Sequence, residues 1–175
     1  MKKSVTLVFI FCLIFSSFII HAQDFAVPHN YRFNKKSDYA KYERYIPKAV
    51  RWLEDTPPNK MQGKRKEVSA FLIKWLEGAP NVSLTLYPEV IQLAKINPDL
   101  LTLFMGSWTR FALANPEMAK DEKKGFTAGL TSLLDYYKKY KNQGLTRDRA
   151  VDAILKKKRK GQLHTWIDSV VKEDK

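Results

Sequence analysis

Residues 97–115 are the stretch that most constrains the fold of this chain. Apolar side chains lie around nearly the whole circumference of a helix drawn through it, instead of forming one stripe. A helix of that kind must be covered by neighbours on most of its sides. Asn97 is the expected cap, Pro98 suits the first helical position, and Asp99 places negative charge at the positive end of the helix dipole. We therefore predict a buried central helix surrounded by other helices.

The beginning of the chain has the pattern of a signal peptide. Two lysines follow Met1, residues 5–20 are almost entirely apolar, and the small Ala22 lies near the expected cut. The apolar run is short for a membrane span and no basic stop follows it, so cleavage is favoured over a membrane anchor. The sequence thus predicts that residues 1–23 are removed and that the protein is exported, periplasmic or extracellular, with no remaining transmembrane span.

This predicted export limits the chemistry that is available. Cys12 is the only cysteine and lies within the signal peptide, so the mature chain has neither a disulfide nor a thiol nucleophile. The net charge is +13, and loss of the two leading lysines reduces it to +11. Residues 24–36 are predicted to form a polar N-terminal arm. Residues 37–175 are predicted to form a single helical domain, large enough for a core that needs no disulfide.

Further helices are predicted from the apolar spacing of the mature chain. Pro47 is expected to kink or divide the first of them, and Thr146 is expected to cap the one before the last. Residues 81–87 alternate apolar and polar side chains without a second strand to pair with, so we predict an extended linker. The predicted fold class is all-α, with six to seven helices in antiparallel hairpins, as a compact bundle or a short α-α stack. The expected helices span residues 37–53, 63–77, 88–96, 97–115, 126–140, 146–160 and 163–171.

A run of five cations is the strongest charge feature of the sequence, and we call it the basic cluster. It is either a solvated helix end that complements the helix dipole or a binding patch for a polyanion. Export argues against intracellular nucleic acid. The candidate partners are anionic lipid head groups, lipopolysaccharide, acidic glycan, extracellular DNA or an acidic protein. The cluster consists of Lys156, Lys157, Lys158, Arg159 and Lys160.

Small residues in the central helix predict a second feature, which we call the notch. A glycine beside a serine lets another backbone or a ligand come close to the helix. Packing of a neighbouring helix is sufficient to explain such a notch, and a binding groove is the alternative. The candidate lining residues are Lys74, Trp75, Met105, Gly106, Trp108 and Arg110.

No catalytic motif is visible in the mature chain. His29 and His164 are isolated, and the chain lacks a zinc-protease motif, a nucleophile elbow, a phosphate loop and a calcium loop. Asp148 and Asp152 adjoin arginines, so a salt-bridged surface is favoured over a metal or acid-base pair. The sequence predicts no metal and no cofactor.

Two runs of residues resemble those of small, exported, uncharacterised helical proteins of Bacteroidota. They are Phe-Met-Gly-Ser-Trp-Thr-Arg-Phe-Ala-Leu at residues 104–113 and Phe-Leu-Ile-Lys-Trp-Leu-Glu-Gly-Ala-Pro at residues 71–80. The ending Ala22-Gln23 is also similar to signal-peptide ends in that phylum. The resemblance spans most of the mature chain and implies an exported helical protein, but it implies no activity.

Three functions remain as hypotheses at this point. The first is a non-enzymatic interaction module whose basic surface binds an acidic partner, either an envelope component or a protein. The second is a small hydrolase of envelope glycan or peptidoglycan, which requires carboxylates gathered in a concave groove. The third is a carrier of an apolar ligand, which requires a sizeable internal cavity beside Trp108.

Overall fold

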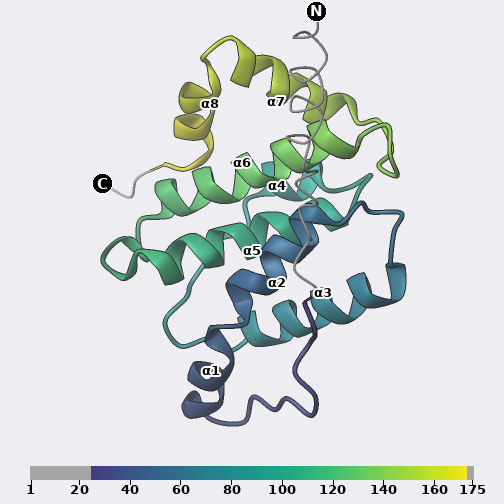
Figure 1. Ribbon diagram of the computed structural model, residues 1–175. Helices are drawn as coiled ribbons and strands as arrows, with labels where there is room; N and C mark the ends of the chain where they lie inside the picture. Colours follow the sequence, from purple (N-terminus) through teal and green to yellow (C-terminus); the bar gives the residue numbers. More distant parts are fainter. Residues whose placement is uncertain (1–24, 173–175) are drawn as a thin grey trace, which may run out of the picture.

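The computed structural model describes residues 25–172, and the predicted signal peptide at 1–23 lies outside them. Over the described residues the chain forms eight α-helices and one short 3₁₀ helix, with no strands (Figure 1). The all-α prediction is confirmed, and the helices number eight instead of six to seven. They are α1 (Lys36–Glu43), α2 (Ile46–Asp55), α3 (Gln62–Leu76), α4 (Pro88–Leu93), α5 (Asp99–Ala114), η1 (Pro116–Met118), α6 (Glu122–Tyr140), α7 (Arg149–Arg159) and α8 (Leu163–Val170).

The central helix predicted from its apolar circumference is α5. None of its side chains between Leu100 and Leu113 is exposed. Its main neighbour is α6, which runs antiparallel to it and comes close at two glycines. An ideal Cβ on Gly129 would lie 2.7 Å from the carbonyl oxygen of Phe104, and one on Gly125 would collide with the indole of Trp108. The absent side chains therefore let the two helices pack at short range.

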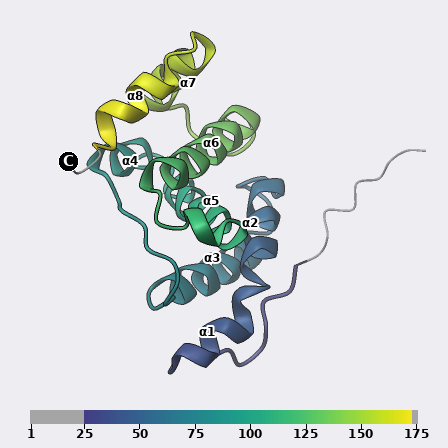
Figure 2. The ribbon, with the colours of Figure 1, turned by 90° about the vertical axis from the view of Figure 1, so that its left-hand side faces the viewer.

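The opposite side of α5 is covered by α2 and α3. An ideal Cβ on Gly106 would lie 2.9 Å from a methyl group of Val50 and 3.0 Å from one of Leu72. The glycine therefore faces side chains of both helices. Figure 2 shows the resulting order, with α7 and α8 outside α6, then α5, then α2 and α3, and α1 at the far end. No helix in the described part of the chain is long and apolar enough to cross a membrane.

Two predicted helix caps are wrong. Asn97 and Thr146 bond to each other, and Asp148 caps α7 in place of Thr146. The side-chain amide of Asn97 donates to the carbonyl of Thr146 at 2.8 Å and accepts from its N–H at 2.9 Å. It therefore joins two loops and does not cap α5. Asp148 caps α7, since its carboxylate accepts the N–H of Ala150 at 2.8 Å. This cap is buried, which corrects its predicted place on a salt-bridged surface.

The other half of that prediction agrees with the structure, because Asp152 forms ion pairs at the surface. Its carboxylate lies 3.3 Å from the Nζ of Lys141 and 3.2 Å from the Nε of Arg147. Burial raises the pKa of Asp152, but hydrogen bonds from Arg147 and Lys141 lower it further, so the net pKa is below its usual value. The two aspartates thus play different parts, one as a cap and one as a surface ion-pair partner.

The extended linker and the N-terminal arm both pack on the helices. Pro47 lies in the first turn of α2, which begins at Ile46 after a break behind α1. Of the two predicted effects of Pro47, a kink or a division into two helices, the structure shows the division. Residues 82–87 form no regular element, and Tyr87 is held there by a hydrogen bond of 2.7 Å from its hydroxyl to Glu122 at the start of α6. In the arm, the ring of Phe25 lies 6.4 Å from that of Phe71 in α3. Aromatic packing of this kind fixes the arm to the core.

Candidate functional site

An open groove of ≈ 690 Å³ lies over α6, and we call it the α6 groove. Its volume lies within the range of about 300–1,000 Å³ that small-molecule sites occupy. Helices α2, α5 and α8 contribute to its walls, so segments far apart in the sequence meet here. The lining residues are Glu54, Arg110, Phe111, Asp121, Lys123, Lys124, Thr127, Ala128, Thr131, Ser132, Asp135 and His164.

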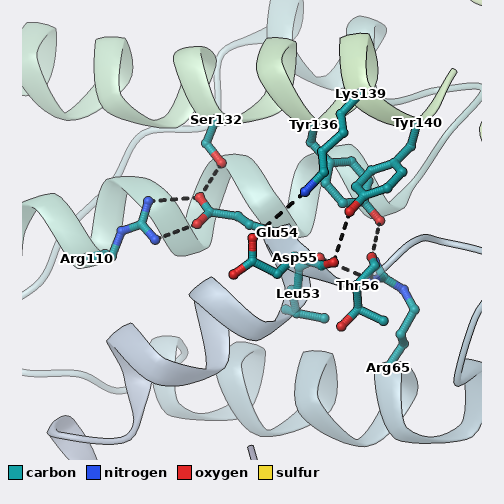
Figure 3. Close-up of polar contacts among 10 residues, drawn as sticks. All are labelled: Leu53, Glu54, Asp55, Thr56, Arg65, Arg110, Ser132, Tyr136, Lys139 and Tyr140. Atoms are coloured by element: carbon teal, nitrogen blue, oxygen red, sulfur yellow. Dashed lines mark hydrogen bonds and ion pairs between the residues drawn. The ribbon is translucent and has the colours of Figure 1, made fainter. Parts of the chain in front are cut away.

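The most highly bonded group in this groove is the carboxylate of Glu54, near the end of α2. Its Oε1 accepts hydrogen bonds from Ser132 at 2.6 Å, Ser107 at 2.8 Å and Arg110 at 2.8 Å. Its Oε2 accepts a second bond from Arg110 at 2.6 Å. Figure 3 shows Arg110 and Ser132 converging on this carboxylate from two different helices. We call Glu54, Ser107, Arg110 and Ser132 the Glu54 cluster.

The surroundings of Glu54 keep it ionised. Burial raises the pKa of this carboxyl, but hydrogen bonds from Arg110, Ser132 and Ser107, together with the positive charge of Arg110, lower it further. The net pKa lies below its usual value of 4.5. A general acid needs a pKa near the working pH. Glu54 is therefore a poor proton donor at neutral pH, and its bonds hold α2, α5 and α6 together.

A second set of polar contacts satisfies the end of α2. Arg65 donates to the carbonyl of Thr56 at 2.8 Å, and Tyr136 donates to the same oxygen at 3.1 Å (Figure 3). Tyr140 donates to the carbonyl of Asp55 at 2.9 Å. Burial raises the pKa of Tyr136, so its hydroxyl stays protonated and remains a donor. These contacts supply partners for the carbonyls that a helix end leaves unpaired.

The other two carboxylates of the α6 groove also have cationic partners. Asp121 lies 3.1 Å from the Nζ of Lys124, and Asp135 lies 2.6 Å from the Nζ of Lys158. Across residues 25–172, no group of three or more His, Cys, Asp or Glu side chains is arranged to hold a metal ion. The groove therefore presents ion pairs and hydroxyls, not a set of free carboxylates.

The basic cluster lies in the last turn of α7 and just beyond it. Lys158 forms an ion pair with Asp135 at the rim of the α6 groove. Among the described residues, no ion pair involves the other four cations of the cluster. Lys156, Arg159 and Lys160 are exposed, and Lys157 is half-buried. Within residues 25–172, the cluster therefore combines one ion-paired charge with four that have no ion-pair partner.

The carbonyls at the end of α7 do not need the side chains of the basic cluster. Gly161 has a φ of +70°, in the left-handed region that favours glycine. Its N–H donates to the carbonyl of Lys158 at 3.2 Å, and the N–H of Gln162 donates to that of Lys157 at 2.9 Å. This is a Schellman motif, in which backbone groups close the helix. The end of α7 therefore does not depend on the cationic side chains of the basic cluster.

The residues predicted to line the notch do not lie together in the structure. Gly106 faces α2 and α3, whereas Trp108 faces α6 and lies beside Gly125. The indole of Trp75 is buried and donates to the carbonyl of Tyr39 at 3.0 Å. Lys74 is exposed and Met105 is half-buried, and neither lines the α6 groove. Arg110 is the one member that lines this groove, where it binds Glu54.

No protein-family model, curated protein or solved structure matches this chain. Its candidate site must therefore be interpreted from its own geometry and charge.

Proposed function

We propose that this protein is exported and acts as a non-enzymatic interaction module that binds an acidic partner through the basic cluster. Its helices would form a compact bundle of antiparallel hairpins that presents α7 at one edge. The observation that carries the proposal is that four cations of the cluster, Lys156, Lys157, Arg159 and Lys160, have no ion-pair partner among the described residues. The partner would be an anionic envelope component or an acidic protein.

Electrostatics favours this proposal over a solvated helix end. The dipole of α7 attracts positive charge to its last turn, but the effect falls off within that turn and is worth about 0.3–1 kcal/mol per charge. The four cations other than Lys158 still exceed what the dipole requires, and they repel one another until an anion approaches. A patch of one sign raises the local concentration of oppositely charged partners and speeds their association. The net charge of the chain without residues 1–23, which is +13 less the two charges of Lys2 and Lys3, or +11, acts in the same direction.

The two alternative functions receive less support. A glycan hydrolase would need one carboxyl that holds a proton and one that is free. The three carboxyls of the α6 groove, Glu54, Asp121 and Asp135, each have a cationic partner instead. A carrier of an apolar ligand would need space beside Trp108, and the indole there is packed against Phe104 and Phe126 at ring distances of 5.7 and 6.4 Å.

The test is retention of the purified protein on immobilised polyphosphate and on immobilised polygalacturonate across a salt series. The test variant is K156Q/K157Q/R159Q/K160Q, which spares Lys158 because that side chain binds Asp135. The matched control, K36Q/K48Q/K60Q/K66Q, removes the same charge from exposed lysines outside the cluster. Because salt competes with each contact, wild type should elute at higher salt than the test variant on both resins.

The comparison between the two variants decides the outcome. We expect the test variant to lose affinity by about tenfold or more and the control by much less, with helicity by circular dichroism unchanged in both. Equal loss in both variants would mean that overall charge, not the basic cluster, causes retention. Equal elution of wild type and the test variant would overturn the proposal.

A further inference from the structure

The lining of the α6 groove is long in one direction, and we call its α6 side the channel. The α6 side of its lining extends from Asp121 to Asp135, which corresponds to about 21 Å at the helical rise of 1.5 Å per residue. Short side chains, Ala128 and Thr131, occupy the middle of this stretch, and charged side chains stand at its ends. Ala128 and Thr131 are shorter than the charged side chains at both ends of the stretch, so the groove is deeper in its middle. A ligand with several linked units would fit such a channel better than a compact one.

The lining favours a sugar chain over a peptide. A strand edge recognises an extended peptide by main-chain hydrogen bonds, and a groove between helices recognises the apolar face of an amphipathic helix. The groove is walled by helices, whose backbone groups bond within the helix. What the groove offers instead are hydroxyls, ionised groups and the ring of Phe111. Among the described residues, the hydroxyl of Thr131 has no hydrogen-bond partner, so it is available to a ligand. Sugar rings carry the hydroxyls and the apolar faces that such a lining complements.

The basic cluster adjoins one end of this channel. The ion pair of 2.6 Å between Lys158 and Asp135 joins the last turn of α7 to the rim of the α6 groove. Figure 1 shows α7 and α8 packed over α6, and His164 of α8 is part of the groove lining. A chain that extended past the Asp135 end of the groove would meet the last turn of α7, which carries the basic cluster. The groove and the cluster can act as two parts of one binding surface.

We infer that the α6 groove binds the sugar rings of an acidic oligosaccharide whose anionic groups contact the basic cluster. This inference rests on the proposed function, because it names the chemical class of the acidic partner. It adds one requirement that charge alone does not impose, namely that the middle of the groove must stay open.

The experiment measures binding of hexagalacturonate, hexagalactose and hexaglutamate by isothermal titration calorimetry. The groove variant is A128W, which fills the middle of the channel. Its matched control is A40W, which adds the same side chain at an exposed position of α1 outside the groove. A milder variant, T131V, removes only a hydroxyl and keeps the inference testable if A128W is unstable by circular dichroism.

We expect wild type to bind hexagalacturonate more tightly than either comparison ligand. A128W should lower this affinity by about tenfold or more, and T131V by about threefold, the effect of one lost hydrogen bond. A40W should bind as wild type does. Retention of A128W on immobilised polyphosphate should be unchanged, because the basic cluster is intact in that variant.

The remaining outcomes distinguish a failure of the groove inference from a failure of the proposed function. If A128W and T131V bind hexagalacturonate as wild type does, the groove inference is overturned, while the role of the cluster is judged on polyphosphate alone. If A128W weakens hexaglutamate as much as hexagalacturonate, the ligand is an acidic chain of either kind and the assignment to sugar fails. If the K156Q/K157Q/R159Q/K160Q variant binds both polyphosphate and hexagalacturonate normally, the proposed function itself fails.

Discussion

The Glu54 cluster and the basic cluster are both groups of charged side chains on neighbouring faces of the protein, but they differ in how their charges are satisfied. The carboxylate of Glu54 accepts four hydrogen bonds from three side chains on two other helices. In the basic cluster, one cation of five has an ion-pair partner among the described residues. The first arrangement joins helices, whereas the second leaves charge available to another molecule.

The cost of burying charge explains this difference. A charge removed from water must be paired and hydrogen-bonded, or the folded state loses stability. Glu54 retains only 22% exposure of its side chain, so its partners are required by its position. Cations at a helix end stay hydrated, and no partner is required for the fold. Substitutions in the two clusters should therefore affect different properties, stability in one and binding in the other.

The largest effect on stability should come from E54A. This substitution leaves Arg110, Ser107 and Ser132 without their shared acceptor in a partly buried place. We expect a loss of about 2–4 kcal/mol in the free energy of unfolding, measured by urea denaturation. The double variant E54A/R110A should recover part of this loss, because it no longer leaves a guanidinium unpaired. A change below about 0.5 kcal/mol in E54A, the range of ordinary surface substitutions, would contradict a structural role for the cluster.

A smaller effect should appear in the pH dependence of stability. The pKa of Glu54 in the folded protein is lower than its usual value of 4.5, so the folded state binds fewer protons in that range than the unfolded state. The stabilisation from its ionised form is therefore complete above the unfolded pKa and is lost as the pH falls through the folded pKa. The difference in unfolding free energy between wild type and E54A should shrink as the pH falls below 4.5.

The control for this pH series is E67A, at an exposed glutamate of α3. Among the described residues, Glu67 has no hydrogen bond or ion pair from its side chain. Its difference from wild type should stay small at every pH. A difference between wild type and E54A that stays constant from neutral pH to acid would show that the ionised form of Glu54 contributes nothing.

The sequence was sufficient for features that are local along the chain. The burial of α5 follows from apolar residues on all its sides, and the end of α7 follows from Gly161. The basic cluster is visible because its members are consecutive. Features that depend on distant segments were missed. Ser132 lies 78 residues from Glu54, and no periodicity of either helix indicates that the two side chains meet.

The prediction that Asn97 caps α5 was also wrong because of a contact between distant segments. Asparagine before a helix usually caps it, and nothing local contradicts that interpretation. The competing partner, Thr146, lies 49 residues away and becomes a neighbour only when α6 returns along α5. The α6 groove was missed for this reason too, because Glu54, Arg110 and His164 come from three separate helices. A polar residue within an apolar helix face, such as Ser107, was the one local signal of a buried polar contact.

The smallest effect on stability should come from the variant that most weakens binding. In K156Q/K157Q/R159Q/K160Q no hydrogen bond or ion pair described for residues 25–172 is broken, and the Schellman motif at Gly161 uses backbone atoms alone. Loss of favourable contacts with the dipole of α7 is offset by relief of repulsion between adjacent cations. We expect an unfolding free energy within about 0.5 kcal/mol of wild type, measured in the same urea series as E54A. A loss of about 2 kcal/mol or more would mean that the cluster stabilises the end of α7, and the contrast between a structural and a binding cluster would be wrong.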